Sequence, residues 1–215
     1  MVDVAQLERL TTRDVLSLAV ELQRGVIERE AMKLVVAADW ADRHCPATVD
    51  PDLAARTAGG KVIPGSDRAR LFGGDGTPEV LEFAPAELGV AYEMSRWQAN
   101  RLIADALDLR HRLPRLWGRV LAGEVPAWKA CKIAAATRQL SKDAAGQVDA
   151  EVCEAVSRES WTRFCDLLTG RIIAADPELA QALADQAARA RFVRTGRSKG
   201  QGMTSIHAQA SQGEV

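Results

Sequence analysis

The stretch FAPAELGVAYEMSRWQANRLIADALDLRHRLP, residues 83–114, decides the fold. It predicts a short helix from Ala86, a break near Glu93 and Met94, and a longer helix that Ser95 caps. Apolar residues recur at helical spacing and predict five inward side chains: Leu88, Tyr92, Met94, Ala99 and Leu102. Two helices separated by such a short break form a helix-turn-helix pattern.

The opposite side of the second helix is polar and carries Arg96, Gln98, Asn100 and Arg101. A DNA-reading helix keeps its contact residues on such a face. The alternative is an ordinary helical hairpin buried in a bundle. The turn favours that alternative, because Glu93 stands where a glycine with positive φ is preferred.

Charge is distributed unevenly along the 215 residues, although the net charge is only -1. Residues 1–95 carry 10 Lys and Arg against 16 Asp and Glu, whereas residues 96–140 carry 9 against 3. A basic segment of this kind indicates a surface for nucleic acid. We therefore expect four cations to be phosphate anchors: Arg110, Arg112, Lys129 and Lys132.

A long helix is predicted over residues 12–43, opened by the capping-box pattern Thr11-x-x-Asp14. At 1.5 Å per residue this helix is about 45 to 50 Å long, which exceeds what a small core needs. Its apolar stripe changes phase near Val26 and Ile27. We expect it either to brace the domain or to pair with a second copy of the chain.

Glycine and proline dominate residues 45–82, which predicts a loop or linker. Downstream, helix-start signals occur at Pro114, Pro126, Ser141, Ser160 and Asp176-Pro177, and residues 203–210 alternate as a strand does. The predicted fold is an all-α helical bundle with a helix-turn-helix-like hairpin and a C-terminal strand stub. Its expected parts are a long helix (1–44), a linker (45–82), a helical core (83–200) and a strand with tail (201–215).

The sequence carries no motif for catalysis, metal or cofactor binding. The three histidines, His44, His111 and His207, lie far apart, and no serine or cysteine occurs in a nucleophile motif. Four cysteines without a paired spacing indicate reduced, buried thiols. No signal peptide or transmembrane run is recognisable, so a cytoplasmic protein without a membrane partner is expected.

Residues 87–141 resemble the domain of unknown function 222, the 13E12 repeat family. The matching features are Arg101-Leu102, the run 109–114 (LRHRLP), the run 122–125 (AGEV) and the Ala-rich helix after Trp128. The segment 191–210 resembles the point where that domain turns into a strand. In this family the domain usually precedes an HNH nuclease finger, so the resemblance implies association with DNA.

No HNH finger follows the strand in this chain, so no catalytic or metal-binding residue is transferred from the family, and the chain is expected to be a truncated member. The function expected from the resemblance and the basic segment is a DNA-binding or substrate-positioning module of an HNH-endonuclease-type protein. Two alternatives stay open. One is a helical protein-protein module that dimerises or recruits a partner, and the other is a remnant without function.

Overall fold

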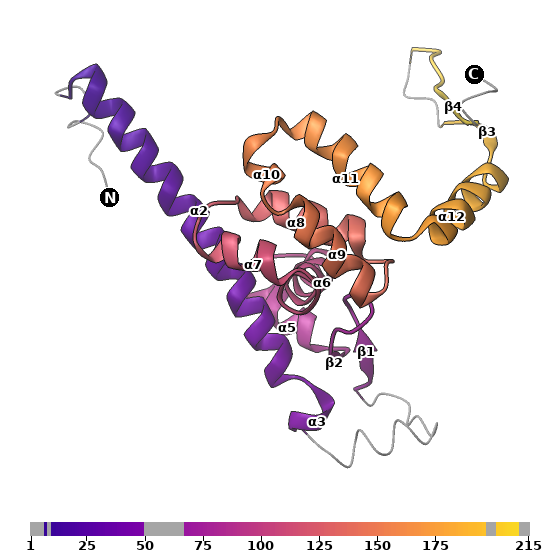
Figure 1. The fold of residues 1–215 in the computed structure, drawn as a ribbon, viewed down its shortest axis with the longest axis horizontal. Coiled ribbons are helices and arrows are strands. Elements are labelled where there is room, and N and C mark those ends of the chain that lie inside the picture. Colours follow the sequence, from indigo (N-terminus) through magenta and orange to yellow (C-terminus); the bar gives the residue numbers. More distant parts are fainter. Residues whose placement is uncertain (1–6, 8–9, 50–66, 197–200, 211–215) are drawn as a thin grey trace.

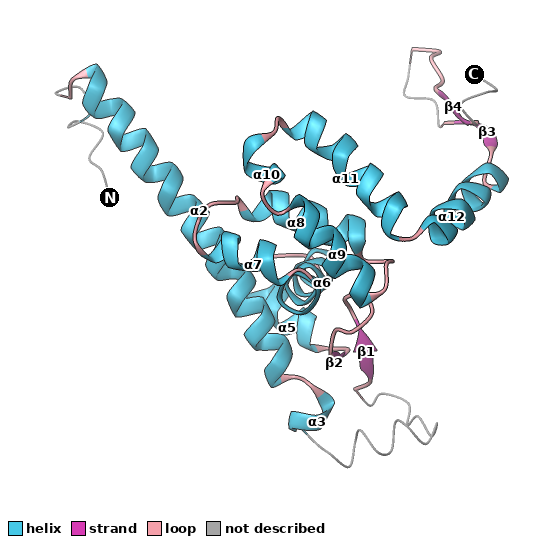
Figure 2. Cartoon of the chain, in the orientation of Figure 1, coloured by secondary structure: helices cyan, strands magenta, loops and turns pink. Residues whose placement is uncertain are grey.

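A computed structural model describes residue 7 and residues 10–49, 67–196 and 201–210. The chain is a helical bundle with two small antiparallel hairpins, as the sequence predicts for a mainly α-helical fold (Figures 1 and 2). In chain order the elements are α2 (Thr12–Arg43), α3 (Pro46–Val49), β1 (Ala69–Leu71), β2 (Glu79–Leu81), α5 (Ala84–Ala91), α6 (Arg96–Arg112), α7 (Pro114–Leu121), α8 (Ala127–Thr137), α9 (Lys142–Val152), α10 (Ala155–Arg158), α11 (Trp161–Ala175), α12 (Pro177–Arg189), β3 (Phe192–Thr195) and β4 (Ile206–Gln209).

Helix α6 is the centre of the bundle and contacts α2, α5, α7, α8 and α9 (Figure 1). From Ile103 to Leu109 every side chain is buried, so this helix is enclosed on all sides along that stretch. A helix that is buried all round belongs to the core of a domain. Most of α6 is therefore a structural element.

The predicted helix-turn-helix hairpin is formed by α5 and α6. Ser95 caps α6 through a reciprocal capping box with Gln98. Between the helices, the Met94 amide donates to the Gly89 carbonyl (2.8 Å) and the Glu93 amide donates to the Val90 carbonyl (3.2 Å). These two bonds make a Schellman C-cap, which needs a left-handed residue, and Glu93 adopts φ of 53° there. The unfavourable turn residue expected from the sequence is thus present.

Helix α2 differs between its two halves. Its C-terminal half buries Ala31, Leu34, Ala38 and Ala41 against the bundle. Its N-terminal half, which Thr11 and Asp14 open with the predicted capping box, extends away from the bundle (Figure 1). Helix propensity and the capping box determine where α2 begins, whereas the bundle buries residues only in its second half.

Residues 67–82, expected as part of a linker, are folded onto the bundle. Strands β1 and β2 pair with Arg70 opposite Val80, and Val80 is fully buried. The turn between the strands packs so closely that a Cβ on Gly74 would lie 2.2 Å from Arg112 Nη1. Within the rest of the expected linker, residues 46–49 form the short helix α3, and residues 50–66 lie outside the described residues.

The predicted helix starts in the second half of the chain are largely confirmed. Ser141, Ser160 and Asp176 are the N-caps of α9, α11 and α12. Asp149 adds a cap that crosses between helices: its carboxylate accepts hydrogen bonds from the Arg115 amide (2.8 Å) and the Leu116 amide (3.0 Å) at the start of α7.

The C-terminal region contains one strand more than the sequence predicted. Helix α12 ends at Arg189, and Phe192, which lies inside the expected helical core (83–200), begins β3, which pairs with β4. Both strands are exposed along their length. None of the helices in the described part of the chain combines the length and apolarity that a bilayer crossing requires.

Candidate functional site

The predicted DNA-reading residues lie at the N-terminal end of α6, where this helix reaches the surface. Arg96 and Gln98 are exposed, and Asn100 and Arg101 are partly exposed. Gln98 is used by the fold, because its Oε1 accepts from the Ser95 amide (2.9 Å) and closes the capping box. Arg96 pairs with Glu82 at 3.4 Å. Arg101 and Asn100 are the two predicted residues that open onto a concave surface.

That surface is a groove of about 520 Å³, here named the arginine groove. It is lined by residues from the β1 hairpin, α6 and α8: Arg70, Leu71, Phe72, Trp97, Asn100, Arg101, Ala104, Ala135 and Arg138. Trp97 is 67% exposed, and the guanidinium of Arg101 lies 5.7 Å from the centre of its ring. The groove therefore joins three arginines to an accessible aromatic face.

The arginine groove has an excess of positive charge. Glu82 is shared by Arg70 (3.1 Å) and Arg96 (3.4 Å), and Asp105 by Arg101 (3.7 Å) and Arg138 (2.6 Å). With the Arg112–Asp108 pair beneath, five arginines face three carboxylates. The side chains of Arg70 and Arg101 remain 55% and 40% exposed, so part of this charge reaches solvent.

Asn100 lines the groove and has an unpaired amide oxygen. Its Oδ1 is buried and has no hydrogen-bond partner among the described residues. A buried polar atom left unpaired is costly, so this amide is a natural partner for a ligand that enters the groove.

Arg112 does not fulfil the expectation of a phosphate anchor. Its side chain is 0% exposed, and it bonds Asp108 Oδ1 (3.0 Å) and the carbonyls of Thr137 (3.0 Å) and Leu140 (2.6 Å). The reason is tertiary: the glycine turn at Gly74 and the end of α8 close over it. Arg112 is a structural tie between α6 and the end of α8.

Asp105 and Asp108 connect this buried tie with the groove. Arg138 bonds both, through Nη2 to Asp105 Oδ1 and Nε to Asp108 Oδ2, each at 2.6 Å. Burial raises the pKa of Asp105 above its ordinary value, although the hydrogen bond and charge of Arg138 oppose the shift. Arg101 and Arg138 are therefore held by carboxylates fixed in the core.

The remaining predicted anchors lie on other parts of the surface. Arg110 pairs with Asp42 of α2 at 2.7 Å. Lys129 donates to the Val156 carbonyl (3.2 Å) and lies 5.9 Å from the ring centres of Trp128 and Trp161. Lys132 is exposed on α8. None of these three is among the residues that line the arginine groove.

The predicted contact residues did not include Arg70 and Arg138, the two arginines that complete the groove. Arg70 lay in the expected linker, and Arg138 ended a helix without any partner visible in the sequence. A signal for Arg138 was present: Asp105 and Asp108 interrupt an otherwise apolar run, and a buried carboxylate requires a cation.

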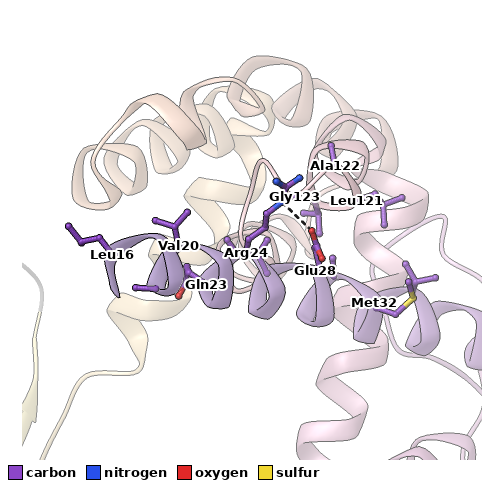
Figure 3. A pocket seen from close by; sticks show the side chains of 14 residues that line it. Leu16, Val20, Gln23, Arg24, Glu28, Met32, Leu121, Ala122 and Gly123 are labelled. Atoms are coloured by element: carbon purple, nitrogen blue, oxygen red, sulfur yellow. Dashed lines mark ion pairs between the residues drawn. The ribbon is translucent and has the colours of Figure 1, made fainter. Parts of the chain in front are cut away.

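A second notable surface is the N-terminal half of α2. We define the α2 face as its apolar side chains Val15, Leu16, Leu18, Ala19, Val20, Leu22, Val26 and Ile27. Leu16 and Val20 are 65% and 68% exposed. Part of this face borders a groove of about 730 Å³, whose other wall is Leu121, Ala122 and Gly123 at the end of α7 (Figure 3).

The four cysteines are unpaired thiols, as the sequence indicated, but only Cys153 is buried, whereas Cys45, Cys131 and Cys165 are partly exposed. Burial raises the pKa of Cys131 to about 12, which keeps this thiol protonated and unreactive at neutral pH. The described residues contain no group of three His, Cys, Asp or Glu side chains arranged to hold a metal ion.

A model for the family described as "Domain of unknown function (DUF222)" matches residues 72–214. Since this match spans more than half of the chain, the protein belongs to that family, as the sequence resemblance indicated. Searches of curated proteins and of solved structures found no match.

Proposed function

We propose that this chain is a DNA-contacting, substrate-positioning module and that the arginine groove is its contact surface. The observation that carries the proposal is the convergence of Arg70, Arg101 and Arg138 with the exposed ring of Trp97 in one concave site. The resemblance to a domain usually joined to an HNH nuclease supports DNA as the ligand.

The contact differs from that of a helix lying lengthwise in the major groove, because the bundle encloses α6 from Ile103 to Leu109. Phosphates would meet the arginines, which are multidentate donors for phosphate oxygens. The Trp97 ring would stack on an accessible base, and the amide of Asn100, which lines the groove, would hydrogen-bond a base edge. Phosphate contacts of this kind position a strand for a nuclease, whereas the single amide provides limited sequence readout.

Fluorescence anisotropy with labelled duplex and single-stranded DNA tests this proposal. Binding at about 50 mM salt should weaken steeply towards 200 mM, because each phosphate contact releases a counterion. Trp97→Ala and Arg101→Glu should each reduce affinity at least about tenfold, in line with a stacking contribution of about 1–3 kcal/mol per base.

Arg163→Glu is the matched control, because Arg163 lies on α11 with its side chain 81% exposed and pairs only loosely with Glu159 at 3.9 Å. It should bind DNA as the parent chain does. Absence of binding at low salt, or equal losses in Arg101→Glu and Arg163→Glu, would contradict the proposal.

A further inference from the structure

The lining of the arginine groove combines a cationic part with an apolar part. The cationic part is Arg70, Arg101 and Arg138. The apolar part is the exposed ring of Trp97 together with side chains from the β1 hairpin, α6 and α8: Leu71, Phe72, Ala104 and Ala135. A ligand that fills this groove must therefore carry anionic groups and a flat or apolar surface at the same time.

The arginines of the groove keep donors for such a ligand. Arg138 uses Nε for Asp108 and Nη2 for Asp105, and its Nη1 makes no hydrogen bond with the described residues. Arg101 pairs with Asp105 through Nε, which leaves both of its Nη atoms without an ion pair in the described part of the chain. Because the aspartates already fix one edge of each guanidinium, little conformational freedom is lost when the other edge binds a phosphate.

The ring of Trp97 requires the face of a base rather than its edge. The ring is 67% exposed, and the guanidinium of Arg101 lies 5.7 Å from its centre. Proteins that bind single strands place an aromatic ring beside a cation in this way, so that a base stacks on the ring while the cation holds the backbone. In a closed duplex the neighbouring base pairs cover the base faces, and only phosphates and base edges are accessible.

The size and shape of the groove agree with an unpaired nucleotide. Its volume of about 520 Å³ lies in the range of about 300–1,000 Å³ that is typical of sites for a single small ligand. Duplex readers instead insert a helix or a β-ribbon into a major groove about 12 Å wide. Helix α6 cannot be inserted in this way, because the bundle buries it from Ile103 to Leu109.

We infer that the arginine groove binds an unpaired nucleotide, and that this chain therefore holds single-stranded DNA in preference to closed duplex DNA. Trp97 stacks on the base, and the arginines bind the phosphates of the same strand. The inference rests on the proposed function, because it specifies the strand state of the DNA that the groove contacts.

Fluorescence anisotropy at about 50 mM salt tests the inference with three labelled ligands, each about 12 nucleotides long. They are a single strand without self-complementarity, the same strand fully paired as a blunt duplex, and a strand of abasic residues with the same number of phosphates. The parent chain should bind the intact strand at least about fivefold more tightly than the duplex or the abasic strand, because only the intact strand offers a base to stack.

Substitutions of Trp97 separate stacking from charge. Trp97→Ala should lose about tenfold in affinity for the intact strand and change less than about twofold on the other two ligands. Trp97→Phe should keep the preference, since an aromatic ring remains. Trp128→Ala is the matched control, because Trp128 is also exposed, at 53%, but does not line the groove. It should bind all three ligands as the parent chain does.

Two results would overturn the inference and leave the proposed DNA contact in place. One is equal affinity of the parent chain for all three ligands, and the other is an equal loss on all three ligands in Trp97→Ala. Absence of binding to every ligand would overturn the proposed function as well. The comparison of ligands on the parent chain requires no variant, so the test does not depend on how the substitutions fold.

Discussion

Two arginines of helix α6, Arg101 and Arg112, have the same local pattern and opposite surroundings. Each pairs with an aspartate one helical turn away, Arg101 with Asp105 at 3.7 Å and Arg112 with Asp108 at 3.0 Å. The side chain of Arg101 is 40% exposed, whereas that of Arg112 is 0% exposed. What surrounds an ion pair, rather than the pair itself, therefore separates a candidate binding residue from a structural one.

Removing the buried arginine should produce the largest effect on stability. Arg112→Ala leaves Asp108 with half of its ion pairing and two carbonyls without a donor. We expect a loss of about 3–5 kcal/mol in the free energy of unfolding, measured by urea denaturation. Arg101→Ala should cost less than about 1 kcal/mol, because its pair is partly solvated. Similar losses in the two variants would remove the distinction between them.

The glycine turn should be nearly as sensitive, because it seals the buried end of α6. In Gly74→Ala the new Cβ would lie 2.2 Å from Arg112 Nη1 and 2.4 Å from the Arg138 carbonyl oxygen. We expect destabilisation of about 1–3 kcal/mol, or more if the backbone cannot shift. Gly146→Ala on α9 meets nothing within 4 Å and should instead stabilise by about 0.5–1 kcal/mol. A tolerated Gly74→Ala would show that the turn does not enclose Arg112.

A substitution in the turn between α5 and α6 should change the free energy of unfolding by a smaller amount, and in the stabilising direction. The left-handed conformation of Glu93, at φ 53°, costs free energy, whereas glycine adopts this conformation without strain. Glu93→Gly should raise the free energy of unfolding by about 0.5–1 kcal/mol after the added chain entropy of glycine is subtracted. Thermal unfolding measures this change. A clear loss of stability would argue against the Schellman cap between α5 and α6.

The titration of Asp105 should make the free energy of unfolding depend on pH. This is the smallest effect that we expect. Burial raises the pKa of Asp105 above its ordinary value of 3.8, so in the interval above that pH the folded chain binds more protons than the unfolded chain. The stabilisation from protonated Asp105 is complete below pH 3.8 and is lost as pH rises through the folded pKa. Asp105→Asn lacks this titration.

Urea denaturation at a series of pH values measures the difference in unfolding free energy between the parent chain and Asp105→Asn. This difference should shift against the parent chain as pH rises. A shift in favour of the parent chain would mean that the Arg138 and Arg101 charges, which lower the pKa of Asp105, outweigh burial.

The helical elements followed from local signals in the sequence. Ser95, Ser141, Ser160 and Asp176 each cap a helix, and the spacing of Leu88 and Ala99 identified the inner face of the hairpin. Capping and helical periodicity act over a few residues, so a single sequence carries them in full.

The parts that escaped prediction depend on contacts far apart in the chain. Arg138 meets Asp105 across 33 positions, and Gly74 meets Asp108 across 34. Residues 69–71 and 79–81 form a hairpin although Gly73, Gly74 and Gly76 between them resemble a flexible linker. Whether a basic residue such as Arg112 faces solvent is decided by these distant partners.

The dependence of DNA affinity on salt in Arg101→Gln measures whether the exposed N-terminal end of α6 contacts phosphate. We predict that the slope of log affinity against log salt becomes shallower by about 0.7–0.9, the value of one lost phosphate contact. The control Arg163→Gln should keep the slope of the parent chain. An unchanged slope in Arg101→Gln would show that Arg101 does not contact phosphate. Arg101 and Arg112 would then both have only a structural role.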